Sequence, residues 1–180
     1  MIKIATAECF THGKIAREIH ALSQRYDGEL GYNYTIPFDT MSDLILVCGI
    51  FAPTVSALKN ILKVEPPKPL KLIGEIKVYD GENDKKVAAL MAKAVKDISN
   101  ADIGIGTTAG IGRGGIAIST SSYTAVTTSG FYADLTSSCS SQILKRQKCG
   151  IEKALHLFSY ILNDDLEELM EDEDIKILEH

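Results

Sequence analysis

Apolar residues recur along this chain with two periods, one near two residues and one near three to four, which indicates strands interleaved with helices. The clearest helical stripes follow Asp80 and Ser140. Their members are Val87, Leu90, Met91, Ala94, Val95 and Ile98 in the first stripe, and Ile151, Ala154, Leu155, Phe158, Ile161 and Leu162 in the second. A third helix is expected to begin near Thr11 and to end at Asp27-Gly28, with Ile15, Ile19, Leu22 and Tyr26 on its apolar face.

Strands are expected in the apolar and β-branched runs between these helices. The runs are residues 1–7, 44–51, 70–79, a strand beginning at 101, and 116–118, with a strand or hairpin arm in 123–135. Pro53 suits the first turn of a short helix, whereas residues 35–38 are expected to be extended because Ile36 precedes a proline. The alternation predicts an α/β fold with one three-layer domain over residues 1–163, in which helices cover a mixed β-sheet. The dense acidic residues in 164–180 predict an acidic C-terminal tail or a short helix.

Composition narrows the class of protein. The chain has 180 residues and a net charge of −5, which fits one soluble domain and argues against nucleic-acid binding. Its longest uncharged apolar run, residues 44–55, is too short to span a bilayer, and no signal segment precedes the first strand. We therefore expect a cytoplasmic protein with no membrane contact. The four cysteines form no C-x-x-C pair, so free thiols and no metal site are expected.

Cys9 is the first candidate for chemistry, because it lies where the opening strand gives way to a helix. A thiol at a helix N-terminus is favoured as the thiolate by the helix dipole and by unpaired backbone N–H groups. His12 and Lys14 would add positive charge nearby. The alternative, with equal weight on position alone, is that Cys9 is a small buried apolar residue.

The second candidate is a glycine loop over residues 107–115. Its backbone N–H groups and threonine hydroxyls suit a phosphate or a carboxylate. The spacing of Gly110, Gly112 and Gly115 matches a dinucleotide fingerprint, but the loop leads into a strand and not a helix, so the Rossmann interpretation fails. A tight turn between adjacent strands is the alternative. The residues predicted to bind a ligand here are Thr107, Thr108, Ala109, Gly110, Gly112, Arg113 and Gly114.

These two loops carry a family resemblance. Residues 6–13 resemble the A-E-S-x-T-G-G signature of the CinA carboxy-terminal, or nicotinamide mononucleotide deamidase, family, and residues 107–115 resemble its T-G-x-A-G-P-G-G-G loop. Three positions depart from that pattern: Cys9 replaces the serine, His12 a glycine and Gly112 the proline. Essentially the whole chain is more similar to the HcgF-like family of methanogen proteins, which serves biosynthesis of the guanylylpyridinol cofactor of [Fe]-hydrogenase.

The resemblance implies a CinA-like fold and a specific reaction. Cys9 would take the carboxylate of guanylylpyridinol as a thioester, after an adenylating partner of the HcgE type has activated it. Guanylylpyridinol would be a substrate, with no tightly bound cofactor. On this hypothesis the N–H groups of Phe10 and Thr11 contact an oxyanion or phosphate, His12 shuttles a proton, and Glu8 orients the ligand or caps the helix.

Two other functions stay open from the sequence. One is an amide hydrolase that acts on a pyridine nucleotide, and the other is a nucleotide-binding protein without catalysis. A covalent adduct on Cys9, release of ammonia, or ligand retention without either would distinguish the three. A homo-oligomer is compatible with each of them.

Overall fold

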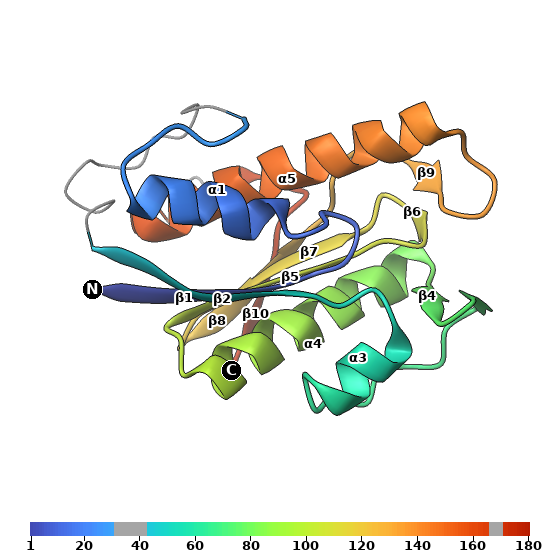
Figure 1. Ribbon diagram of the computed structural model, residues 1–180, viewed down its shortest axis with the longest axis horizontal. Helices are drawn as coiled ribbons and strands as arrows, with labels where there is room; N and C mark the ends of the chain where they lie inside the picture. The colour runs from blue at the N-terminus through green and yellow to red at the C-terminus, as the bar shows by residue number, and fades with distance from the viewer. Residues whose placement is uncertain (31–42, 166–170) are drawn as a thin grey trace.

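A six-stranded mixed sheet forms the middle of the molecule in the computed structural model, which describes residues 1–30, 43–165 and 171–180 (Figure 1). The strand order is β10-β8-β7-β5-β1-β2. In chain order the strands are β1 (Ile2–Glu8), β2 (Leu44–Phe51), β5 (Ile103–Thr108), β7 (Gly115–Ser119), β8 (Tyr123–Thr127) and β10 (Lys176–Glu179). Strand β1 is parallel to both of its neighbours, and every pair from β5 to β10 is antiparallel.

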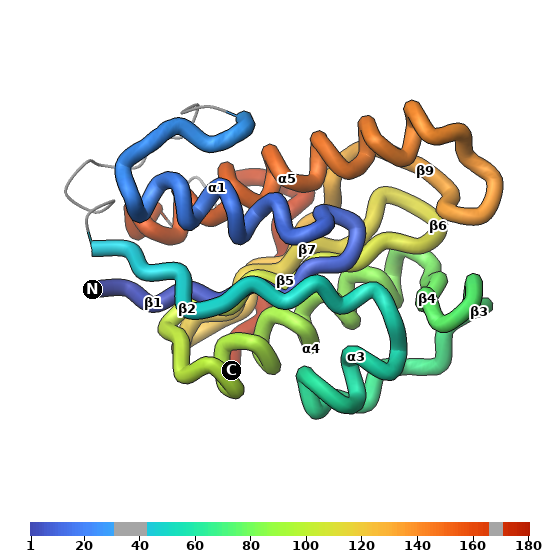
Figure 2. Tube along the Cα trace, in the orientation of Figure 1, coloured from blue at the N-terminus to red at the C-terminus, as the bar shows by residue number. Residues whose placement is uncertain are grey.

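Helices cover both faces of this sheet. Helices α1 (Lys14–Ser23) and α5 (Ser140–Leu162) lie on one face, and α4 (Gly81–Ser99) lies on the other, with the short α3 (Val55–Asn60) beside it (Figures 1 and 2). Helix α4 packs closely because glycines on β5 face it: a Cβ on Gly106 would lie 2.1 Å from the Ala88 carbonyl oxygen. The predicted fold class, a mixed sheet between helical layers, is confirmed.

Two small two-stranded sheets extend the end of the molecule where β1 and β5 finish (Figure 1). Strands β3 (Lys71–Ile73) and β4 (Ile76–Val78) form a hairpin, and β6 (Ile111–Gly112) and β9 (Ala133–Asp134), which are separated in the chain by β7 and β8, form the other two-stranded sheet. The sequence pattern predicted one strand over residues 70–79. The chain instead turns at Gly74, whose φ of +60° is readily available only to glycine, and the two arms pair antiparallel.

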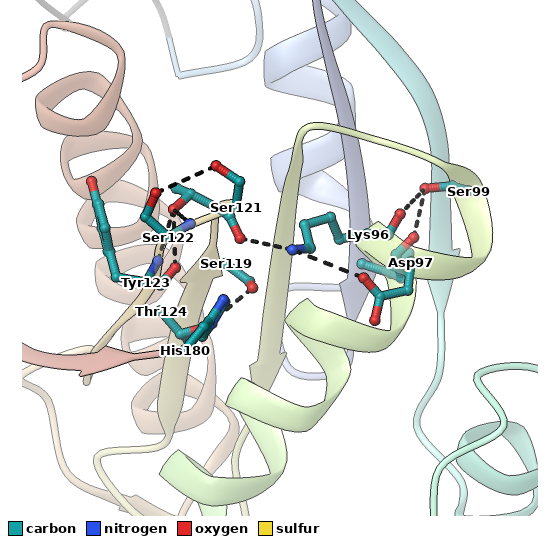
Figure 3. Close-up of polar contacts among 11 residues, drawn as sticks. Lys96, Asp97, Ser99, Ser119, Ser121, Ser122, Tyr123, Thr124 and His180 are labelled. Atoms are coloured by element: carbon teal, nitrogen blue, oxygen red, sulfur yellow. Dashed lines mark hydrogen bonds and ion pairs between the residues drawn. The ribbon is translucent and has the colours of Figure 1, made fainter.

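The last residues differ from the prediction of a tail or short helix. Strand β10 pairs with β8, so the sheet continues past the predicted boundary at residue 163. Its end is held by His180, whose Nε2 lies 2.9 Å from Thr124 Oγ1, and Thr124 donates to Ser119 Oγ at 3.1 Å (Figure 3). Beside it, Lys96 Nζ on α4 donates to the Thr120 carbonyl oxygen at 2.7 Å. The acidic residues before β10 concealed this strand in the sequence.

Two sequence predictions fall at least partly outside the described residues, namely the extended segment 35–38 and the part of the tail or short helix that covers residues 166–170. None of the helices within the described ranges combines the length and the apolar character needed to cross a membrane.

Candidate functional site

Cys9 follows the last residue of β1, at the edge where the parallel strands β1 and β5 both end (Figure 1). Its backbone N–H donates to the Thr107 carbonyl oxygen at 2.9 Å and lies 3.3 Å from Thr107 Oγ1. The chain runs from β1 to β2 through α1 on one face and returns to β5 through α4 on the other. Open α/β sheets bind ligands at such a switch point, outside the carboxyl ends of the strands. The topology therefore places the predicted nucleophile at the preferred binding edge.

The start of α1 differs from the prediction. The helix begins at Lys14 and not near Thr11, because His12 (φ 55°) and Gly13 (φ 76°) both adopt left-handed backbone conformations before it. Cys9 therefore lies outside the first helical turn, and the helix dipole does not act on its sulfur as expected. The residue is also buried, with only 7% of its surface exposed.

Glu8, and not Cys9, lies at the N-terminus of helix α1. Its fully buried carboxylate accepts hydrogen bonds from the backbone N–H groups of Ile15 at 3.2 Å and Ala16 at 2.8 Å. The hydroxyls of Thr6 and Thr11 donate to the same carboxylate at 3.0 and 2.7 Å. Hydrogen bonds to a charged acceptor are stronger than neutral ones, so this group fixes the turn firmly. Of the two roles predicted for Glu8, the geometry favours capping of the helix.

Threonines extend this network to the turn at Cys9. Thr11 Oγ1 lies 2.8 Å from Thr107 Oγ1, and both residues are fully buried. Their hydroxyls are therefore engaged in holding the turn. Thr108 differs, because its buried Oγ1 has no hydrogen-bond partner in the described parts of the chain. Glu8 is in register with Thr107, so Thr108 comes beside Cys9 and faces the other side of the sheet from Thr107.

Lys77 on β4 is a buried cationic side chain near Cys9. It is 1% exposed, and its Nζ donates to the Ala52 carbonyl oxygen at 2.7 Å. Burial lowers the pKa of Lys77, whereas the charge of Cys9, a hydrogen bond with its side chain and the charge of Asp84 act to raise it. A buried lysine amine in contact with a thiol is able to accept its proton, and the ammonium then stabilises the thiolate.

Two buried charges from opposite helical layers hold the glycine loop. Asp84 Oδ2 on α4 accepts a hydrogen bond from the Gly110 N–H at 2.8 Å. Arg146 Nη1 on α5 donates to the carbonyl oxygens of Gly110 at 3.0 Å, Gly112 at 3.1 Å and Ala133 at 2.6 Å. The Gly110 residue is thus held at its N–H by one layer and at its C=O by the other.

Burial strongly shifts the pKa values of the side chains in this cluster. It raises the pKa of Asp84 to about 7, although the hydrogen bond from Gly110 and the cations Arg146 and Lys77 limit the rise. Burial also raises the pKa of Tyr79 to about 12, and the Asp84 carboxylate adds to that effect. Asp84 Oδ1 and Arg146 Nε are buried without hydrogen-bond partners in the described residues. Clustered, perturbed groups of this kind are typical of functional sites.

Lys77, Asp84 and Arg146 are not among the site residues predicted from the sequence. The sequence offers one signal for such residues, which is a charged residue at a position where the apolar pattern predicts a buried side chain. Lys77 interrupts the run 76–79, and Asp84 lies three residues before Val87 on the same helical stripe. Such charges are seldom fully buried without a partner, but a single sequence does not show the partner.

The glycine loop is more strongly packed than predicted. Gly110 is required by its neighbour, since a Cβ there would lie 2.3 Å from the Tyr79 carbonyl oxygen, and the Ile111 N–H donates to that same oxygen at 2.8 Å. With its own N–H bound to Asp84, Gly110 has no donor for a ligand. Gly112 and Gly114 have positive φ values of 133° and 71°, as the turn interpretation requires.

The Arg113 end of the loop borders a cavity. This cavity, of about 720 Å³, lies between the first turns of α4, the loop, β8 and the segment at β10. Its cationic side chains are Lys85, Lys86, Arg113 and Lys176. Lys85 is paired with Glu82 at 2.7 Å. A second cavity, of about 650 Å³, lies between α1 and β2, and neither cavity is lined by Cys9.

The remaining predicted residues divide between surface and core. His12 is exposed, with its ring 5.4 Å from that of Phe51, and partial burial and Lys14 lower its pKa against the influence of Glu8. Phe10 is 8% exposed and belongs to the main apolar cluster, as does Ala109. Among residues 1–30, 43–165 and 171–180, no three His, Cys, Asp or Glu side chains are grouped so that they could hold a metal ion.

Comparison with known proteins gives the family. The chain matches the family described as "FeGP cofactor biosynthesis protein HcgF" over residues 1–162. A UPF0254 protein of Methanothermobacter thermautotrophicus (strain Winter) is 52% identical over 164 residues, which cover 91% of this chain and 98% of that protein. A UPF0254 protein of Methanopyrus kandleri is 41% identical over 174 residues, which cover 96% of this chain and 94% of that protein.

Solved structures share the fold at low identity. A CinA superfamily protein from Enterobacter cloacae has a TM-score of 0.58 and 18% identity, over 89% of this chain and 82% of that one. A competence or damage-inducible protein from Enterobacter asburiae has a TM-score of 0.53 and 21% identity, over 93% and 87%. These likenesses confirm the CinA-like fold and leave the activity to the site. Together with the match over residues 1–162 and the methanogen relatives, they show a CinA-like chain that belongs to the HcgF family of FeGP cofactor biosynthesis proteins.

Proposed function

We propose that this chain binds guanylylpyridinol and holds it as a thioester between its carboxyl carbon and the Cys9 sulfur. Membership of a cofactor biosynthesis family supports the class of ligand. The proposal rests on the buried Lys77 near Cys9, at the edge of the sheet where β1 and β5 end, because the Cys9 side chain acts to raise the pKa of Lys77. A free carboxylate does not acylate a thiol, so the acyl group must arrive activated, as an adenylate made from ATP by an HcgE-type partner.

The reaction exchanges one acyl bond for another. The Cys9 proton passes to the Lys77 amine, and the thiolate then attacks the carboxyl carbon of the adenylate. A C–S bond forms, the bond from the carboxyl carbon to the phosphate oxygen breaks, and AMP leaves with the electron pair of that bond. The proton on Lys77 passes to solvent when the product leaves. No oxidant or reductant is needed.

The tetrahedral oxyanion needs donors near the sulfur. The backbone N–H groups of Phe10 and Thr11 follow Cys9 directly and donate to no group in the described residues. The Thr108 hydroxyl beside Cys9 is buried and also without a partner. Donors that are fixed in advance stabilise a developing oxyanion more strongly than water does. We assign the oxyanion site to these three groups.

The nucleotide part of the ligand is assigned to the cavity at Arg113 and Gly114. Its volume of about 720 Å³ is suitable for a nucleotide-sized group, and Arg113 and Lys86 supply positive charge for a phosphodiester. Gly114 connects the two regions, since a Cβ there would lie 3.5 Å from the Phe10 ring. His12 is exposed on the α1 side of the turn, where it can exchange a proton with solvent.

The experiment that tests this function is intact-mass measurement after incubation with guanylylpyridinol, ATP and the adenylating partner. The expected result is an adduct equal to the ligand mass minus water, located on Cys9 and removed by hydroxylamine. Cys9→Ser and Lys77→Met should each lower loading by at least 100-fold, because one loses the nucleophile and the other its proton acceptor. Cys139→Ser is the matched control and should load normally.

Other outcomes identify the alternatives. Release of ammonia from a pyridine nucleotide, without an adduct, would indicate an amide hydrolase. Retention of guanylylpyridinol without either would indicate a binding protein. Undiminished loading of Cys9→Ser would move the chemistry to another residue and refute the proposal.

A further inference from the structure

The C-terminal segment 171–180 forms one wall of the cavity of about 720 Å³, and this segment lies outside the family match, which ends at residue 162. Its residues in the lining are Glu173, Asp174, Ile175, Lys176 and Leu178. The rest of the lining comes from the start of α4, the glycine loop and β8. The part of the chain that matches the family therefore supplies most of the cavity, and the C-terminal segment adds a wall with charges of its own.

Pairing with β8 fixes which residues of β10 face the cavity. Lys176 pairs with Val126, and Leu178 pairs with Thr124. Lys176, Leu178 and Val126 all line the cavity, whereas Ile177 packs against the main apolar cluster on the other side of the sheet. Because successive side chains of a strand point to opposite faces, a slip by one residue would remove Lys176 from the cavity.

The wall is held at both of its ends. Lys153 on α5 forms an ion pair with Asp172 at 2.6 Å, and the Asp174 N–H donates to Asp172 Oδ1 at 3.0 Å. At the other end, His180 Nε2 lies 2.9 Å from Thr124 Oγ1 (Figure 3). A wall that is fixed in this way loses little freedom when a ligand binds to it.

The start of β10 lies at the same edge of the sheet as Cys9. One row of paired residues crosses the sheet from Ala7 on β1 to Lys176 on β10, by way of Gly106, Ala117 and Val126. Four strand spacings of about 4.8 Å separate the ends of this row, so Lys176 is about 19 Å from β1. A ligand joined to the turn after β1 and extended along this edge would pass the glycine loop and reach the wall with its far end.

The charges of the wall match the hydrogen-bonding groups of a guanine base. Guanine has acceptors at O6 and N7, which a lysine ammonium binds, and donors at N1–H and the N2 amino group, which a carboxylate binds. Lys176 supplies the ammonium, and Glu173 and Asp174 supply carboxylates. Adenine has an amino group in place of O6 and an acceptor in place of N1–H, so it would lose both kinds of contact.

We propose that residues 173–176 bind the guanine base of the ligand and select guanine over adenine nucleotides. The inference rests on the proposed function for the identity of the ligand, and it adds the residues that recognise the base. The carboxylates of Glu173 and Asp174 would repel a phosphodiester, which is left to Arg113 and Lys86 across the cavity. Selection against adenine also keeps the AMP that the acylation step releases out of this cavity.

The test is isothermal titration calorimetry of the full chain with GMP, AMP and IMP as probes. Wild type should bind GMP about tenfold more tightly than AMP. In Lys176→Met the Kd for GMP should rise about tenfold, while the Kd for AMP should change by less than about twofold. Lys93→Met is the matched control, because Lys93 is an exposed lysine of α4 that does not line the cavity, and it should leave both Kd values unchanged.

IMP tests the carboxylates, because its base keeps O6, N7 and N1–H of guanine but lacks the N2 amino group. Wild type should bind GMP about fivefold more tightly than IMP. In the double variant Glu173→Ala/Asp174→Ala this difference should disappear. Glu179→Ala is the matched control and should retain it, because Glu179 is an exposed residue of β10 outside the cavity.

Three results would overturn the inference. The first is equal binding of GMP and AMP by wild type, and the second is binding of neither. The third is an equal loss of GMP and AMP binding in Lys176→Met, which would mean that this lysine contacts the phosphate and not the base. Glu173, Asp174 and Lys176 are exposed, so their variants should fold, and the selectivity of wild type decides alone if one of them does not.

The assay contains no guanylylpyridinol, ATP or adenylating partner and does not involve the Cys9 sulfur, so its result is separate from that of the proposed function. Selective GMP binding that depends on Lys176, without thioester formation, would refute the function alone. Thioester formation without a preference for GMP would refute the inference alone.

Discussion

The replacement of Asp84 by asparagine should change how the stability of the protein depends on pH, whatever the protein binds. The folded-state pKa of Asp84 is about 7, and an unfolded aspartate titrates near pH 4. The folded protein therefore binds more protons than the unfolded chain between about pH 4 and pH 7. The stability that this group contributes is complete below pH 4 and is lost as the pH rises to about 7.

The magnitude follows from the width of that window. Each pH unit within it changes the free energy of unfolding by about 1.4 kcal/mol, so wild type should lose about 3 kcal/mol from this group between pH 5 and pH 7. Asparagine does not titrate. The free energy of unfolding of Asp84→Asn minus that of wild type should therefore increase by about 3 kcal/mol from pH 5 to pH 8. Effects independent of pH, such as the altered contact with Gly110, cancel in this difference.

Urea denaturation at pH 5, 6, 7 and 8, followed by circular dichroism, measures this difference. Asp172→Asn is the control, because the hydrogen bond from Lys153 lowers the pKa of Asp172 and its contribution is complete above about pH 4. The difference between Asp172→Asn and wild type should therefore stay constant over this range. A constant difference for Asp84→Asn as well, within about 0.5 kcal/mol, would refute the argument that burial keeps this carboxyl protonated below neutral pH.

Three further outcomes are expected. Gly110→Ala should lower the free energy of unfolding, measured in urea, by about 3 kcal/mol, because the added Cβ would clash with backbone atoms. Gly130→Ala should lower it by only about 1 kcal/mol, because Gly130 has a φ of +74° but open space around it. Similar losses in the two variants would contradict the packing argument. Glu8→Ala should cost about 3 kcal/mol by the same measurement, since four donors lose their acceptor, and a loss below 1 kcal/mol would contradict the capping role. Limiting iodoacetamide at pH 7 should label Cys139 before Cys9 in peptide maps, because Cys139 is exposed and a hydrogen bond from a neighbouring serine lowers its pKa; labelling of Cys9 first would mean that its turn opens readily in solution.

The layers of the fold could be predicted from periodicity, because an amphipathic helix or strand records in its own residues which side faces the core. The stripes on α4 and α5 and the uncharged run of β2 are examples, and the helices begin within a residue or two of the expected positions at Asp80 and Ser140. The start of α1 was wrong by three residues. Left-handed conformations at His12 and Gly13 delay it, and the carboxylate that caps it precedes Cys9 in the chain.

The sequence by itself determined the α/β class, the position of Cys9 at the end of a strand and the resemblance to the HcgF family. Only the tertiary structure decided which charged groups are buried near the Cys9 turn and the glycine loop. Lys77, Asp84 and Arg146 come from three separate segments, 68 to 137 positions after Cys9. Their roles depend on burial and on contacts between distant segments. Neither of these produces a periodic pattern in the local sequence. Strand β10 could not be predicted for the same reason. It has few apolar positions, and it forms a strand because it pairs with β8 and not because of a pattern in its own residues.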